Sequence, residues 1–132
     1  MNVLYPFLIL ALFTGCSYHY EEVSSLGYAK GELVHTVILA LKGDVSQKRK
    51  EEIIRLLGSL SEIDETQGLT VSTKARTNDT RAQRDYDLIL QMSFKSQTEL
   101  ESYSINAHHL DVRAKLKSDL ASAPVVYDYW VE

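Results

Sequence analysis

The clearest pattern in the chain is an alternation of side chains along residues 33–41. One set consists of Leu33, His35, Val37, Leu39 and Leu41, and the other of Val34, Thr36, Ile38 and Ala40. A period of two predicts a β-strand, and the apolar character of both sets predicts that both of its faces are covered.

Three later segments also read as strands. Gly68 opens a strand over residues 69–74, and the closing sequence VVYDYWV is β-branched and aromatic. Between them, the segment YDLILQMSF alternates strongly and places four apolar side chains on one face: Leu88, Leu90, Met92 and Phe94. These residues are expected to point toward the core.

Helical spacing separates the strands. Asp44 with Gln47 predicts a helix start, after which apolar residues recur at Ile53, Leu57 and Leu60. Ser96 with Glu99 predicts a second start. That helix passes through Leu100 and Tyr103, and a further helical run carries Val112, Leu116 and Leu120 and ends before Pro124.

The order of these elements, β-α-β-β-α-β, predicts an α+β, ferredoxin-like fold with an antiparallel sheet. Such a sheet carries its helices on one face. Because the other face is also apolar here, we expect a second copy of the same sheet to cover it. The expected assembly is a homodimer, in the form of a dimeric α/β barrel.

The size and charge of the chain narrow its function. With 132 residues, the chain has room for one domain. Its formal net charge of −4 gives no basic surface for nucleic acid, so nucleic-acid binding is disfavoured.

The amino-terminal residues indicate where the protein is located in the cell. Residues 1–15 carry no charge and are short for a membrane span, which favours a signal peptide. They precede Cys16, the only cysteine, and the stretch resembles a bacterial lipoprotein signal. We therefore expect cleavage before Cys16, its lipidation, a tether over residues 16–31, and a domain over residues 32–132 held at a membrane of the bacterial cell envelope. The alternatives are an unlipidated signal peptide or a short buried segment.

Four segments together resemble the stress-responsive dimeric α/β-barrel domain family, abbreviated Dabb. They are GELVHTVILALK, RDYDLILQMSF, LESYSINAHHL and VVYDYWV. In plant members of the family that resemble polyketide cyclases, a tyrosine and a histidine act as acid and base, and the resemblance places these at Tyr103 and His109. A first-strand histidine of those members corresponds to His35, and a third-strand histidine corresponds to Leu88.

Helical spacing distinguishes the two neighbouring histidines. His109 shares a face with Val112 and Leu116 and should be buried, whereas His108 is rotated by about 100° and should be exposed. His35 lies on the strand face expected to look toward the helices, so Tyr103, His109 and His35 are the candidate catalytic residues of one cleft. The structural alternative is a buried hydrogen bond between Tyr103 and His109, with His35 bonded to a backbone carbonyl.

Other chemistry is less well supported. No acidic residue or cysteine joins the histidines, so we expect no metal, and no motif indicates a cofactor. Four basic residues in the polar loop could attract an acidic ligand to a pocket mouth, or could form a solvated loop: Lys74, Arg76, Arg81 and Arg84.

Two functions remain. The first is a membrane-anchored, dimeric stress-response domain that binds a small apolar or acidic ligand in the helix–sheet cleft, or is purely structural, without catalysis. The alternative is a small-molecule enzyme that transfers protons, as a polyketide cyclase or an isomerase does, through Tyr103 and His109. A cleft of a few hundred Å³ beside His109 would favour a ligand binder or an enzyme over a filled core.

Overall fold

A four-stranded antiparallel sheet forms one layer of the domain in the computed structural model, which describes residues 27–132. Its strands are β1 (Leu33–Leu39), β2 (Gln67–Thr73), β3 (Leu88–Phe94) and β4 (Val125–Trp130). They lie in the order β2-β3-β1-β4. This arrangement confirms the predicted ferredoxin-like α+β fold.

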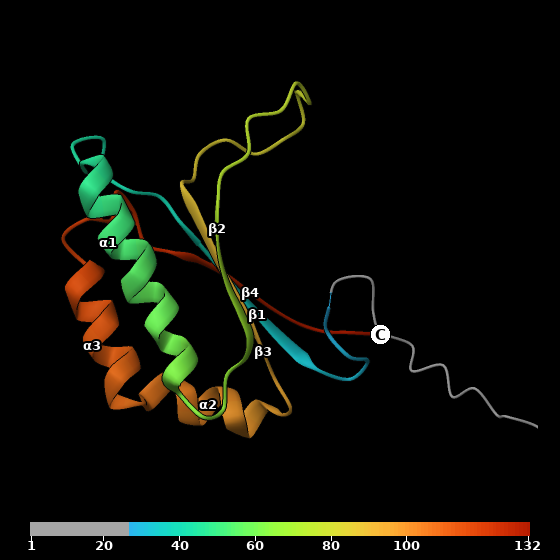
Figure 1. Ribbon diagram of the computed structural model, residues 1–132. Helices are drawn as coiled ribbons and strands as arrows, with labels where there is room; N and C mark the ends of the chain where they lie inside the picture. Colours follow the sequence, from blue (N-terminus) through green and yellow to red (C-terminus); the bar gives the residue numbers. More distant parts are fainter. Residues whose placement is uncertain (1–26) are drawn as a thin grey trace, which may run out of the picture.

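The helices form the second layer, on one face of the sheet (Figure 1). They are α1 (Gln47–Gly58), the short 3-10 helix η1 (Ser59–Glu62), α2 (Gln97–Ile105) and α3 (Ala107–Leu116). The core between the layers holds the predicted face of β3, Leu88, Leu90, Met92 and Phe94, against Ile53, Leu57, Leu60, Val112 and Leu116. The alternation in the sequence therefore assigned the faces of the sheet correctly.

Hydrogen bonds of side chains to the backbone fix where the helices begin. Ser96 caps α2 as predicted, since its Oγ accepts from the Glu99 amide at 3.2 Å. The prediction for α1 was wrong: Ser46, not Asp44, is the cap, and its Oγ accepts from the Arg49 amide at 3.1 Å. Ser46 directly precedes the first helical residue, in an extended conformation from which its side chain reaches the first turn.

The two helical runs expected after β3 form two separate helices, α2 and α3. Asn106 is extended between them, and its Oδ1 accepts from the His108 amide at 2.9 Å. Asparagine is a favoured cap, so the sequence encodes a new helix start there. Tyr103 lies near the end of α2 and His109 in the first turn of α3. The second helix ends at Leu116, short of the predicted Leu120, which instead bridges to Leu41 beyond β1.

The second face of the sheet is partly covered by its own chain. Tyr28 is 6% exposed, and its ring lies 3.2 Å from where a Cβ on Gly68 would stand. Val34 and Ser93, opposite each other on neighbouring strands of this face, are buried within the protomer. The other face of the sheet was expected to be covered by a partner sheet, but Val34 on this face is already buried within the protomer. Tyr28, near the end of the predicted tether, packs against the domain.

The predicted signal peptide, Cys16 and most of the tether lie outside the described residues. Within residues 27–132, no helix is both long enough and apolar enough to cross a membrane.

Candidate functional site

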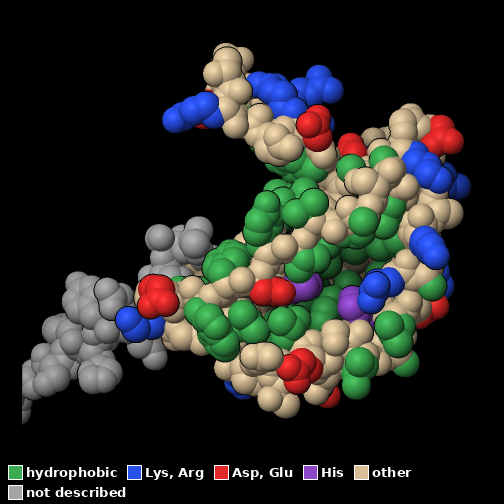
Figure 2. Space-filling model, turned by 180° about the vertical axis from the view of Figure 1, so that it is seen from behind, with side chains coloured by type: hydrophobic (Ala, Val, Ile, Leu, Met, Phe, Trp, Pro, Cys, Tyr) green, Lys and Arg blue, Asp and Glu red, His purple; other side chains and the backbone are tan. Residues whose placement is uncertain are grey.

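A cavity of about 980 Å³ lies between the helices and the sheet. Its walls come from strands β1, β3 and β4, from helices α1, η1, α2 and α3, and from the segment before β4. Much of the lining is apolar: Val37, Leu39, Leu57, Leu60, Leu90, Leu116, Leu120, Pro124 and Val126. In the space-filling view this face is hollowed, with hydrophobic side chains around it and histidines inside it (Figure 2). The cavity is larger than the few hundred Å³ set as the mark of a ligand-binding cleft.

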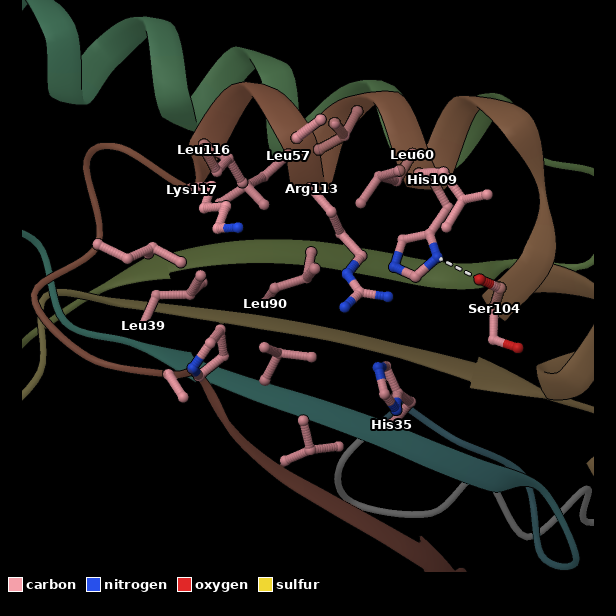
Figure 3. A pocket seen from close by; sticks show the side chains of 18 of the residues that line it. His35, Leu39, Leu57, Leu60, Leu90, Ser104, His109, Arg113, Leu116 and Lys117 are labelled. Atoms are coloured by element: carbon pink, nitrogen blue, oxygen red, sulfur yellow. Dashed lines mark hydrogen bonds between the residues drawn. The ribbon is translucent and has the colours of Figure 1, made fainter.

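His109 lies on the helical wall of this cavity and has a defined tautomer. Its Nδ1 is 3.1 Å from the backbone oxygen of Ser104 (Figure 3). A carbonyl only accepts, so Nδ1 donates and carries the proton in the neutral ring. Burial lowers the pKa of His109, backbone hydrogen bonding opposes that shift, and the positive charges of Arg113 and His35 add to it. The neutral ring therefore keeps its lone pair on Nε2 and can act as a base.

Tyr103 packs face to face with His109 instead of hydrogen bonding to it. The ring centroids are 4.2 Å apart with an interplanar angle of 27°. Tyr103 is 1% exposed and lines the cavity, yet within residues 27–132 no hydrogen bond to its hydroxyl is formed. Burial raises its pKa, so the phenol stays protonated. The expected structural hydrogen bond of Tyr103 with His109 was thus wrong, and the buried hydroxyl is left able to meet a ligand.

His35 lines the opposite wall, as predicted from its strand face. Its ring centroid lies 6.0 Å from that of Tyr103, so the structure brings the three candidate residues together. Its Nδ1 donates to Oδ1 of Asp128 at 2.6 Å, rather than to a backbone carbonyl. Asp128 was not among the site residues predicted from the sequence. The available signal was that Asp128 is the one charged residue of VVYDYWV.

His108 was predicted to be exposed, and this was wrong. It is half-buried against η1, with Nε2 3.1 Å from the backbone oxygen of Ser59 and 3.0 Å from the Ser59 hydroxyl. The first turn of α3 packs beside η1 as well as over the sheet, so a side chain that points away from the sheet is still covered there. His108 thus joins two helices and does not line the cavity.

The basic residues of the loop before β3 also do not line the cavity. Lys74 donates to the backbone oxygen of Arg84 at 2.9 Å, and Arg81 pairs with Asp79 at 2.9 Å. The loop is held by its own contacts and extends away from the helices (Figure 1). Within residues 27–132, the lysine and arginine side chains that line the cavity are Arg113 of α3 and Lys117, which directly follows this helix; neither was predicted from the sequence. The spacing of four residues from His109 to Arg113 to Lys117 was the available signal.

Within the described part of the chain, no group of three or more histidine, cysteine, aspartate or glutamate side chains is placed to hold a metal ion. The side chains that line the cavity can provide apolar contact, hydrogen bonds and groups able to transfer a proton.

Comparison with known proteins gives a family match and several similar structures. The family model described as the stress responsive A/B barrel domain matches residues 33–131. No curated protein matches.

Three solved structures represent the neighbours. A hydroxynitrile lyase from Passiflora edulis is 19% identical with a TM-score of 0.69, over 76% of this chain and 94% of the other. A Dabb family protein from Mesorhizobium loti is 22% identical with a TM-score of 0.60, over 76% of this chain and 96% of the other. A dimeric ferredoxin-like protein from Thermobifida fusca is 16% identical with a TM-score of 0.64, over 77% and 92%. At these identities the likeness concerns the fold.

Proposed function

The chain belongs to the stress-responsive A/B barrel domain family, and on that premise we propose that it is a dimeric module that binds a small, largely apolar molecule between α3 and the sheet. The observation that carries this proposal is the cavity of about 980 Å³, lined by the Tyr103 hydroxyl, which has no hydrogen-bond partner within residues 27–132. Protein cores are close-packed, and buried hydroxyls are normally hydrogen-bonded. A bound molecule would supply both the missing contacts and the missing partner.

Assembly and location form the rest of the proposal. Dimerisation is supported by a similar structure described as dimeric and by exposed apolar side chains of β4, among them Val125 and Tyr127 on the face away from the helices. Anchoring at a membrane of the bacterial cell envelope is supported by the uncharged segment before Cys16 alone. Replacing Cys16 by serine should release the protein from membranes, and unchanged retention without lipid mass on the wild type would contradict the anchor.

A neutral apolar dye, N-phenyl-1-naphthylamine, tests the cavity. Its fluorescence should rise and saturate when the full chain is titrated, because the dye leaves water for the cleft. Ala114 lines the cavity, so Ala114→Trp should fill part of it and weaken the dye's binding by about tenfold or more.

The matched control is Ala107→Trp. Ala107 is also an exposed residue of α3 but does not line the cavity, so this variant should bind the dye as the wild type does. Equal binding by Ala114→Trp and the wild type would contradict the proposed site, as would a signal that never saturates. Native mass spectrometry of the same proteins would report the dimer and any retained small molecule.

The second candidate function is proton transfer on a carbonyl compound, and one observation favours it. The contact of His109 Nδ1 with Ser104 leaves Nε2 as the acceptor, beside a protonated Tyr103. His109 would then remove a proton next to the carbonyl, and the Tyr103 hydroxyl would donate to the carbonyl oxygen.

Exchange of the α-protons of octan-2-one in D2O, followed by NMR, measures this step directly. The enzyme hypothesis expects exchange above background, lost in His109→Gln and Tyr103→Phe while the melting temperature and dye binding barely move. Exchange at the background rate with the wild type would rule out this reaction for ketones and leave the binding function standing.

A further inference from the structure

We propose that the ligand of this cleft is an amphipathic carboxylic acid, with its carboxylate held by Arg113 and Lys117 and its apolar body along the sheet. This inference rests on the proposed function and names the ligand class. The experiment below separates its failure from the failure of the binding function itself.

The two cations follow His109 along one side of α3. Residues four apart on a helix are neighbours on its surface, so positions 109, 113 and 117 form a row of basic side chains. All three line the cavity. In the close view, the guanidinium of Arg113 reaches down from α3 beside His109, and the Lys117 side chain projects into the same space (Figure 3).

Neither cation has an anionic partner in the described part of the chain. The salt bridges of residues 27–132 include Lys115 with Asp111 at 2.6 Å, on the same helix, but none involving Arg113 or Lys117. Among the described residues, no aspartate or glutamate lines the cavity. Although the net charge of the chain is −4, the charged side chains that residues 27–132 contribute to the cavity lining are basic. Such a lining attracts anions and disfavours cations.

The donors match a carboxylate in kind and number. A guanidinium binds both oxygens of a carboxylate through a fork of N–H groups, and an ammonium adds a further charged donor. The buried Tyr103 hydroxyl, which has no partner within residues 27–132, can supply another hydrogen bond. Beyond this polar end, Val37, Leu39 and Leu90 offer apolar contact from the sheet. A phosphate dianion, with more charge and a third oxygen, would need more donors.

Octanoate and octan-1-ol test the head group, because they share an apolar chain and differ in charge. Calorimetric titration of the full chain should show octanoate binding at least about tenfold more tightly than octan-1-ol, as charge-assisted hydrogen bonds imply. Arg113→Gln should weaken octanoate by about tenfold and leave octan-1-ol unchanged, and Lys117→Gln should act in the same direction with a smaller effect. Salt should weaken octanoate binding alone, since Arg113 is exposed enough to be screened.

The matched control is Lys115→Gln, which removes a cation of the same helix that does not line the cavity. It should bind octanoate as the wild type does. Equal affinity for the acid and the alcohol would overturn the carboxylate assignment while the binding function stands. Octyl phosphate binding more tightly than octanoate would overturn it as well. If neither the acid, the alcohol nor the naphthylamine dye bound, both proposals would fall.

Discussion

The position of the His109 ring in the cavity determines its protonation state. Stacking on Tyr103 and the hydrogen bond to the Ser104 carbonyl fix the ring, and burial is the largest reason that its pKa lies below the ordinary 6.5. The charged groups that lower it further are Arg113 on α3 and His35 on β1. The ring that lines the cavity is therefore neutral at neutral pH.

This shift predicts a dependence of stability on pH. Because the folded-state pKa is lower than the unfolded one, the unfolded chain takes up the proton first as the pH falls below about 6.5. The free energy of unfolding should therefore decrease from pH 7.5 toward the folded-state pKa. Urea denaturation at a series of pH values measures it, and His109→Gln should flatten the curve over this range. An identical slope in both proteins would show that His109 is not the group responsible.

His108 has a role that can be measured separately. Its Nε2 contacts Ser59 at the start of η1, so His108→Ala should lower the free energy of unfolding by about 1 kcal/mol, as for a typical hydrogen bond. A double-mutant cycle with Ser59→Ala tests the contact with the hydroxyl, since Ser59 Oγ lies 3.0 Å from Nε2. Strictly additive losses would place the contribution of His108 in its bond to the Ser59 backbone oxygen.

At the scale of elements, the sequence predicted strands well and contacts between distant strands poorly. Burial on one side requires alternation, so the inward face of β3 could be read directly from Leu88 and Phe94. Tyr103, His35 and His109 also meet as expected. Asp128 could not be placed, because its contact with His35 depends on the register of β1 with β4. Arg113 was missed because a basic residue on a helix normally faces solvent. The cavity beneath it depends on how α3 crosses the sheet, which the sequence pattern does not reveal.

Gly68 of β2 shows how one residue can hold an element in place. Its φ is +58°, a conformation that costs other residues about 1–2 kcal/mol, and an added Cβ would stand 3.2 Å from the Tyr28 ring. Gly68→Ala should lower the free energy of unfolding by at least that amount in chemical denaturation. Gly58→Ala at the end of α1, where nothing lies within 4 Å, is the control and should be neutral or stabilising. Equal effects of the two substitutions would contradict the packing of Tyr28 on β2.

At the scale of the whole molecule, dimerisation depends on the part of the sheet face away from the helices that its own chain leaves uncovered. Tyr28 occupies one end of this face, and the middle carries a polar contact in which Gln91 Nε2 donates to Thr36 and to Tyr129, each at 3.0 Å. Ile38 lies on the same face, next to Val125 of β4. A partner sheet would therefore cover a mixed surface of polar and apolar residues.

Ile38→Asp tests this interface by placing a charge where a partner sheet is expected. The wild type should sediment as a dimer at micromolar concentration, and the variant should be monomeric or aggregated, because burying an unpaired charge is costly. Ile105→Asp is the control, since Ile105 is 76% exposed on α2, in the helical layer, and this variant should stay dimeric. A monomeric wild type would rule out the barrel as the solution state.

The segment that follows Tyr28 brings the beginning of the described domain next to its carboxyl-terminal end. Gly31 donates to the backbone oxygen of Val131 at 2.8 Å, and Val131 donates to that of Glu32 at 3.0 Å, so the chain enters the sheet where it leaves it (Figure 1). Joining these two ends should therefore leave the order of the strands in space unchanged. A circular permutant that joins residue 132 to residue 27 through a short glycine linker, with new ends in the exposed loop near Asn78, should fold and keep the cavity. Its circular dichroism spectrum and its binding of the naphthylamine dye should match those of the parent, whereas a permutant opened within β1 should lose both.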